Sequence, residues 1–341
     1  MKRFCLLFLA LSLILCGCAQ ERPLEKKQYD ATFLSLFDTV TTIVGQAESK
    51  ESFAAQAQKI HDELLFYHEL FDIYNNYPGV NNLKTVNDNA GLVPVTVDPI
   101  LLELLTDCKT YYDLTGGMVN VAMGSVLQLW HEARNAGIND PANAKLPDQV
   151  ELMAAAEHIN LDALVIDKEA STVYISDPLV RLDVGAVGKG WAVQKVAQNA
   201  PEGLLISVGG NVCATGPKNA EGTPWVIGIQ DPKTPGANLH TIYVRQESVV
   251  TSGDYQRTYQ VAGRQYHHII DPQTQMPATH WCSVSIVCAD SGLADALSTA
   301  LFLLPLEQGK ALAEKCGVEA FWVNAAGEEF MTSGFETILR T

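Results

Sequence analysis

Hydrophobic residues that recur three or four positions apart predict several helices in this chain. Over residues 53–71 the apolar positions would line one face of a helix. A second helix is predicted over 99–112, with Asp98 as its N-cap and Pro99 at its first helical position. The same periodicity predicts helices over 147–158, 191–199, 293–304 and 305–316.

Short runs rich in β-branched and aromatic residues predict strands in the second half of the chain. They cover 164–166, 172–175, 204–207, 225–229, 241–244, 267–270 and 283–287. Strands and helices do not alternate regularly, as they would in a doubly wound parallel sheet. We therefore expect an α+β fold with a mostly antiparallel sheet packed with helices. The chain has no internal repeat and no low-complexity linker after residue 31, which indicates one enzyme-sized unit.

The first residues have the pattern of an export signal. Two basic residues at positions 2 and 3 precede an apolar run over 4–15 that is too short to span a bilayer alone. The run leads into Leu15-Cys16-Gly17-Cys18, which resembles a bacterial lipobox with Cys18 as the lipidated cysteine. Cys16 fits less well, because bulky Leu15 would then occupy the position that requires a small residue. The remaining alternative is that both cysteines are ordinary residues of the signal peptide and that cleavage occurs further along the chain.

Composition and charge exclude several classes of protein. The 341 residues are 47% hydrophobic and 18% charged, the balance of a chain that buries a large core. With 23 basic and 39 acidic residues the net charge is -16, which argues against binding to nucleic acid or to a membrane through basic residues. Five cysteines, Cys108, Cys213, Cys282, Cys288 and Cys316, follow the N-terminal segment without regular spacing, so we expect them buried and reduced.

A glycine-rich turn, Asp183-Val184-Gly185-Ala186-Val187-Gly188-Lys189-Gly190, separates an extended run from the helix predicted over 191–199. Backbone N–H groups at the positive end of a helix bind phosphate, and Lys189 would add a mobile cation. The turn is not a Walker A loop, because Gly190 stands where Ser or Thr would hold magnesium, and its G-x-x-G-x-G spacing is not the dinucleotide fingerprint. Glycines that only permit close backbone packing remain an alternative.

Two further groups of residues are candidates for chemistry. Asp295 and Thr299 lie four positions apart on one helical face, and a carboxylate with a hydroxyl is a hard oxygen pair suited to Mg²⁺. A helix-capping charge and a hydroxyl bonded back to its own turn would explain the pair without a metal. His267 and His268 lie in the strand predicted over 267–270 and would face opposite sides, which supports a general base better than a zinc site.

Taken in order, these segments resemble the FAD:protein FMN transferase family, historically called the thiamine-biosynthesis lipoprotein family. The similar segments are 182–190, 207–211, 225–232, 251–255, 268–272 and 294–299, and the resemblance covers essentially the whole mature chain. It implies a T-fold-like architecture with the flavin in a cleft between two lobes. With the lipobox, it implies a lipoprotein signal peptide over 1–17, a lipidated tether over 18–30 and a flavin transferase catalytic domain over 31–341. The mature protein would be lipid-anchored through Cys18 outside the cytoplasmic membrane.

The resemblance also implies site residues. FAD contacts would be Phe37, Tyr74, Met118, Val119, Asn120, Asp183, Lys189 and the backbone near Ile269. Mg²⁺ would be bound by Asp295, Thr299 and the carbonyl oxygen of Ala186. Asn120 replaces a frequent Asp, and Gln275 replaces a usual Gly, so the local loop shape is expected to differ.

The reaction implied is attack by a Thr or Ser hydroxyl of an acceptor protein on the FMN-side phosphorus of FAD, which gives a phosphoester-linked FMN and AMP. Positioning and electrostatics would do this work. His268 is the expected base, with Asp271 and Asp254 as other proton acceptors and a structural role as the alternative. Two other functions remain: an Mg²⁺-dependent FAD pyrophosphatase, in which water replaces the hydroxyl, and a non-catalytic exported lipoprotein that stores or delivers flavin.

Overall fold

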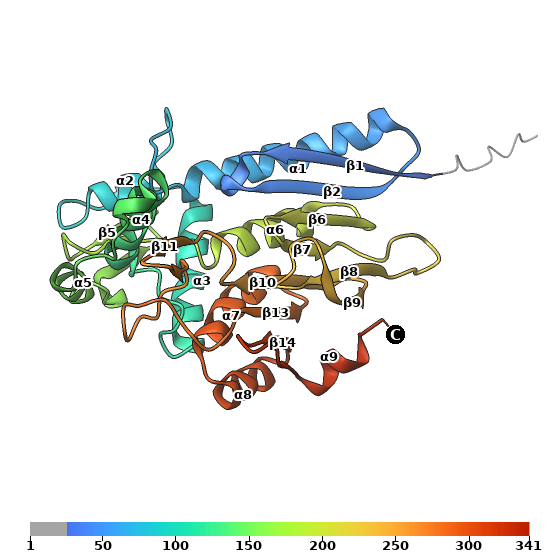
Figure 1. Cartoon of the computed structure of the whole chain (residues 1–341). Coiled ribbons are helices and arrows are strands. Elements are labelled where there is room, and N and C mark those ends of the chain that lie inside the picture. Colours follow the sequence, from blue (N-terminus) through green and yellow to red (C-terminus); the bar gives the residue numbers. More distant parts are fainter. Residues whose placement is uncertain (1–25, 341) are drawn as a thin grey trace, which may run out of the picture.

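An eight-stranded antiparallel sheet is the centre of the fold (Figure 1). The computed structural model describes residues 26–340, and the strand order in this sheet is β1-β2-β6-β7-β10-β13-β14-β15. The strands are β1 (Lys27–Leu34), β2 (Val40–Ala47), β6 (Leu204–Val208), β7 (Asn211–Ala214), β10 (Ser248–Gly253), β13 (Ser283–Cys288), β14 (Glu319–Val323) and β15 (Glu329–Met331). Every neighbouring pair is antiparallel, which confirms the expected fold class.

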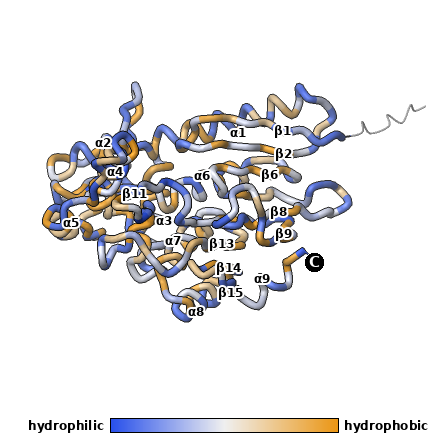
Figure 2. Tube along the Cα trace, viewed as in Figure 1, coloured by the Kyte–Doolittle hydropathy of each residue, from blue (hydrophilic) through white to orange (hydrophobic). Residues whose placement is uncertain are grey.

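Each face of this sheet is covered by other elements. Helices α1 (Lys50–Phe71), α6 (Gly188–Asn199), α7 (Ser291–Leu303) and α8 (Leu306–Cys316) cover one face and share a hydrophobic core with it. The hairpin of β8 (Trp225–Gln230) and β9 (Asn238–Val244), with the short helix α9 (Ser333–Thr337), packs on the other face. Hydrophilic residues gather in the outer loops (Figure 2). The sheet is therefore the middle of three layers.

A smaller part of the molecule is inserted mainly between β2 and β6. It contains α2 (Leu83–Asp88), α3 (Pro99–Leu114), α4 (Gly124–Asn139), α5 (Gln149–Ala156) and the sheet β3 (Val95–Thr96), β5 (Thr172–Ile175) and β4 (Leu164–Asp167). The hairpin of β11 (Tyr259–Val261) and β12 (Arg264–Tyr266) joins this part from much later in the chain. Trp130, Leu152 and Tyr259 form a separate small core there, so two distant segments meet.

Most predicted elements are present, but two expectations were wrong. Residues 267–270 do not form a strand: the chain bends at His268, and only Ile270 makes an isolated bridge, to Pro277, because a turn follows at Asp271. Strand β1 begins at Lys27, so residues 27–30 pair with β2 instead of continuing the expected tether. Tyr29, Ala31 and Phe33 on this strand pack against the main core, which explains the pairing.

The N-terminal export signal and the cysteines were also the subject of expectations. The signal peptide over 1–17 and the lipid site at Cys18 lie outside the described residues. Within 26–340, no helix has the length and hydrophobicity needed to cross a membrane. All five cysteines of this range are unpaired; Cys108 and Cys213 are buried as expected, whereas Cys282, Cys288 and Cys316 are only half-buried.

Candidate functional site

One cavity of about 1120 Å³ brings together all the residues expected at the site. It is lined from the large sheet side by β10, α7 and the loop between β1 and β2, and from the smaller part by residues near α4. The expected residues on its wall are Phe37, Tyr74, Met118, Val119, Asn120, Asp183, Ala186, Lys189, His268, Ile269, Asp295 and Thr299. Segments separated by more than half of the chain therefore meet at one place.

The glycine-rich turn contributes residues both to the cavity wall and to the packing of α6 against α7. Gly185, Ala186 and Gly188 line the cavity just before and at the start of α6, where the positive end of the helix lies. Gly190 instead faces α7: a Cβ there would lie 2.3 Å from the Ser291 carbonyl oxygen and 2.4 Å from Asp295 Cβ. Close packing thus explains Gly190, whereas Gly185 is exposed and lines the cavity.

Asp295 is a buried carboxylate held from two sides. It is 4% exposed, and its Oδ2 accepts a hydrogen bond of 2.8 Å from the Gly190 N–H and lies 3.9 Å from Lys189 Nζ. Burial raises the pKa of Asp295, and the Lys189 charge opposes that rise. The N-cap of α7 is Asp290, so Asp295 is not a capping residue.

Thr299 stands one turn after Asp295 on α7 and also lines the cavity. The hydroxyl that bonds back to this helix is that of Ser298, which donates to the Asp295 carbonyl at 2.8 Å. The described residues contain no group of three His, Cys, Asp or Glu side chains that could hold a metal. The carboxylate of Asp295, the hydroxyl of Thr299 and the carbonyl of Ala186 are nevertheless hard oxygen donors, which fit Mg²⁺.

The two adjacent histidines have different surroundings. His267 is fully used: its Nε2–H donates to the Ala278 carbonyl at 2.8 Å, and its Nδ1 accepts from the Ile269 N–H at 3.2 Å. His268 Nδ1 is buried without a hydrogen-bond partner among the described residues. Burial and the nearby charge of Arg257 lower the pKa of His268 to about 3, so its imidazole is neutral at pH 7.

Phe37 lies in a loop with unfavourable backbone angles between β1 and β2. Ser35, Phe37 and Asp38 have φ values of 81°, 52° and 53°, in the left-handed region that favours glycine. The Phe37 N–H donates to His68 Nδ1 at 3.2 Å, and the two rings meet edge to face at 5.5 Å. His68 therefore holds this loop against the cavity, and such conformations concentrate at functional sites.

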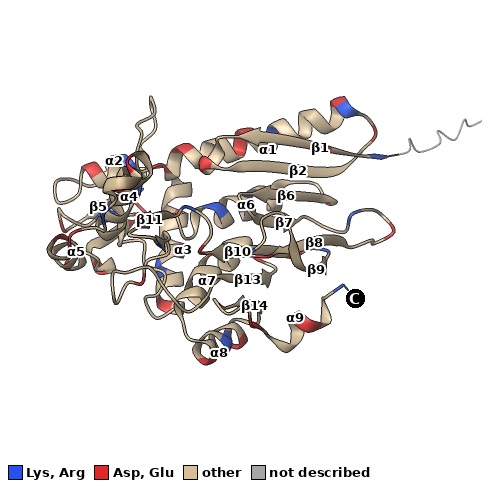
Figure 3. Cartoon of the chain, viewed as in Figure 1, with Lys and Arg blue, Asp and Glu red and all other residues tan. Residues whose placement is uncertain are grey.

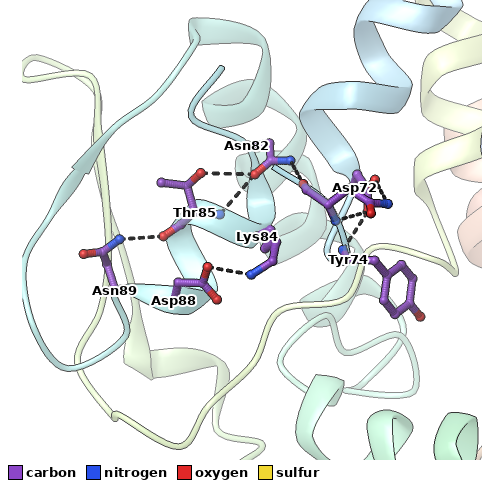
Figure 4. Close-up of polar contacts among 8 residues, drawn as sticks. Asp72, Tyr74, Asn82, Lys84, Thr85, Asp88 and Asn89 are labelled. Carbon is purple, nitrogen blue, oxygen red and sulfur yellow. Dashed lines mark hydrogen bonds and ion pairs between the residues drawn. The ribbon is translucent and has the colours of Figure 1, made fainter. Parts of the chain in front are cut away.

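Tyr74 is positioned by a turn that is bonded to α2. Its N–H donates to Asp72 Oδ1 at 2.6 Å, and its ring points away from that carboxylate (Figure 4). Asn82, the N-cap of α2, donates to the Asn75 carbonyl at 2.8 Å and so fixes the same turn. The Tyr74 ring stacks on His131 at 5.2 Å and is 54% exposed, which leaves it available at the edge of the cavity.

The two departures from the family pattern have local explanations. Asn120 uses both ends of its amide within the protein: Nδ2 donates to the Ile159 carbonyl at 2.8 Å, and Oδ1 accepts from the Ala122 N–H at 2.9 Å. An Asp could not make the first of these bonds. Gln275 has a φ of 57°, a conformation typical of Gly, and its side chain donates to the Pro272 carbonyl at 2.9 Å.

The sequence did not predict several cavity residues, chiefly Arg134 and His131 on α4 and Arg257 after β10. Figure 3 shows acidic residues on α1, α5 and α8 and basic ones on α1 and α8, and the chain as a whole has 39 acidic and 23 basic residues. Arg134 donates to His131 Nδ1 at 2.9 Å. No local pattern could reveal the group, because its members are far apart in sequence.

The fold and the cavity together define a mixed α/β protein with a large antiparallel sheet and one cavity lined by residues from its two parts. The model of the ApbE family matches residues 37–322, and the chain belongs to this family. The FAD:protein FMN transferase of Treponema pallidum is 36% identical over 260 residues, 71% of this chain and 70% of that protein. The FAD:protein FMN transferase of Escherichia coli K12 is 26% identical over 337 residues, 95% and 93% of the two chains.

A solved structure agrees with this relationship. The crystal structure of the ApbE protein of Thermotoga maritima has a TM-score of 0.81 to this chain at 28% sequence identity. The similarity covers 92% of this chain and 100% of that one. The resemblance found in the ordered motifs is thereby confirmed.

Proposed function

We propose that this protein transfers the FMN moiety of FAD to a Thr or Ser hydroxyl of an acceptor protein and releases AMP. The observation that carries the proposal is the convergence of the glycine-rich turn, Asp295 with Thr299, and the rings of Phe37 and Tyr74 on one cavity. The groups that we propose to contact phosphate, a cation and flavin therefore line the same cavity. The name of the Treponema pallidum relative supports the same reaction.

We propose that Asp295, Thr299 and the Ala186 carbonyl hold Mg²⁺, which when bound supplies positive charge to the pyrophosphate. Burial of Asp295 favours this, because an ionised carboxylate in such a place needs a nearby cation. Lys189, 3.9 Å from Asp295, brings a second positive charge to the same wall. The Gly190 N–H fixes the orientation of the carboxylate, so the electrostatic groups are arranged before the substrate arrives.

His268 is the residue that we propose accepts the proton of the attacking hydroxyl. Its free Nδ1 and its neutral state permit this. With a pKa of about 3 it is a weak base in the unliganded protein. Burial is the largest cause of this low pKa, and the negative charge of bound FAD would offset the smaller contributions of Arg257 and Lys189.

The acceptor is proposed to be a membrane or exported protein, which this protein would meet through its own lipid anchor at Cys18. The lipobox resemblance supports this location. A Cys18→Ser variant should leave the membrane fraction or accumulate as an unprocessed precursor. Unchanged mass and unchanged membrane partitioning of that variant would contradict the anchor without affecting the proposed reaction.

One assay separates the three candidate functions. The protein is incubated with FAD, Mg²⁺ and a candidate acceptor protein, and AMP is quantified together with in-gel flavin fluorescence of the acceptor. AMP with a labelled acceptor means a transferase, AMP alone means a pyrophosphatase, and neither product means a carrier. Asp295→Ala should abolish both products, and full activity of this variant with a chelator present would refute the proposed site.

A further inference from the structure

Two arginines from separate segments meet at the cavity. Arg134 comes from α4 and Arg257 from the loop after β10, and both line the cavity with Tyr74 and His131. Neither forms an ion pair with any carboxylate of residues 26–340. The chain has 39 acidic residues against 23 basic ones, so two arginines without acidic partners at one site require an explanation.

The two guanidinium groups carry the same charge and line the same cavity. Arg134 is half-buried, and its pKa is lowered by burial and by the charge of Arg257. The charge of Arg257 also acts on His131 and His268, which places it within electrostatic reach of both the edge and the interior of the cavity. Like charges in a partly dry cavity destabilise each other unless an anion lies between them.

The backbone supports a specific placement of Arg257. Its φ is 48°, a left-handed conformation that residues other than glycine avoid. The positive charge of Arg257 opposes the rise that burial causes in the pKa of Asp183, but no ion pair joins the two side chains. Among residues 26–340 the Arg257 guanidinium forms no ion pair, so its N–H groups remain available to a ligand.

We propose that Arg134 and Arg257 form an oxyanion subsite that binds a phosphate group of FAD, in addition to the phosphate contacts of Lys189 and the glycine-rich turn. Guanidinium groups match phosphate oxygens in pairs of hydrogen bonds, which suits two arginines that lack acidic partners. The subsite rests on the proposed function for the identity of its ligand. The two arginines would add a phosphate contact that none of the sequence motifs described above indicates.

The test compares Arg134→Gln and Arg257→Gln with Arg245→Gln in the full-length protein. Arg245 is exposed, donates to the Gly222 carbonyl at 3.4 Å and is not among the cavity residues, so its variant removes the same charge elsewhere. Dissociation constants are measured for FAD, FMN and AMP, and for riboflavin and adenosine, which lack phosphate. The salt dependence of FAD binding is measured in parallel.

Each cavity variant should weaken FAD binding by about 10-fold or more and reduce its salt dependence, with Arg245→Gln unchanged. Loss of affinity for FMN identifies the phosphate on the flavin side, and loss for AMP identifies the other phosphate. Unchanged FAD affinity would refute the subsite, as would equal losses for riboflavin and adenosine. If the wild-type protein binds no FAD, the proposed function itself fails, whereas failure of the subsite alone leaves FAD binding and transfer intact.

Discussion

Gly190→Ala should separate the two helices that build the proposed metal site. The added methyl carbon would lie 2.3 Å from the Ser291 carbonyl oxygen and 2.4 Å from Asp295 Cβ. A carbon and an oxygen without a covalent bond approach to about 3.3 Å at best. Helices α6 and α7 must therefore move apart by about 1 Å, because neither contact is with the flexible end of a side chain.

The magnitude follows from two terms. Overpacking of a core costs about 1–3 kcal/mol, and weakening the Gly190–Asp295 hydrogen bond to a buried carboxylate costs about 1.5–3 kcal/mol. With partial relaxation we expect a loss of about 3 kcal/mol in the free energy of unfolding, which lowers Tm by roughly 5 °C. Misplacing Asp295 by about 1 Å should reduce the rate of FMN transfer by about 10²-fold.

The assay is thermal unfolding together with AMP release at saturating FAD and Mg²⁺. Gly309→Ala on α8 is the matched control, because its Cβ would meet Trp322 at an ordinary 3.4 Å and alanine is the better helix former. The control should keep its activity and its Tm or gain stability. Wild-type Tm and wild-type activity in Gly190→Ala would refute the argument that the glycine is required for packing.

Three further predictions concern protonation and backbone conformation. Burial makes the pKa of Asp295 higher in the folded protein than in the unfolded chain. The metal-free protein therefore loses stability as the pH rises from the pKa of Asp295 in the unfolded chain to its pKa in the folded protein. Mg²⁺ should therefore raise Tm more at pH 7 than at pH 4, and an equal increase in Asp295→Asn would contradict the assignment. His268→Ala should slow FMN transfer by about 10²-fold or more and retain the affinity for FAD, whereas His267→Ala should mainly lower Tm. Equal small losses of rate in the two variants would mean that His268 has a structural role and is not the base. Ala262→Gly should raise the free energy of unfolding by about 1 kcal/mol in chemical denaturation, because Ala262 has a φ of 50° beside Gly263 in a hairpin turn; an unchanged or lower value would contradict the strain.

Local patterns in the sequence determined much of the fold. The helical periodicity over 53–71 and the capping pair Asp98-Pro99 predicted α1 and α3 because amphipathic spacing and capping depend on near neighbours. The run over 172–175 matched β5 for the same reason. The ordered motifs indicated the family, since each keeps its residues within one short segment. All the expected site residues of the described chain then line one cavity.

Only the tertiary structure decided the features that depend on distant segments. The sequence of residues 27–30 is typical of a polar tether. In the folded protein β2 provides their backbone hydrogen-bond partners, and α1 provides an apolar surface for Tyr29. The meeting of Arg134 with Arg257 and the low pKa of His268 arise from charges and burial contributed by several elements. Electrostatic interactions and desolvation act through space, so the order of residues alone does not encode them in any short pattern.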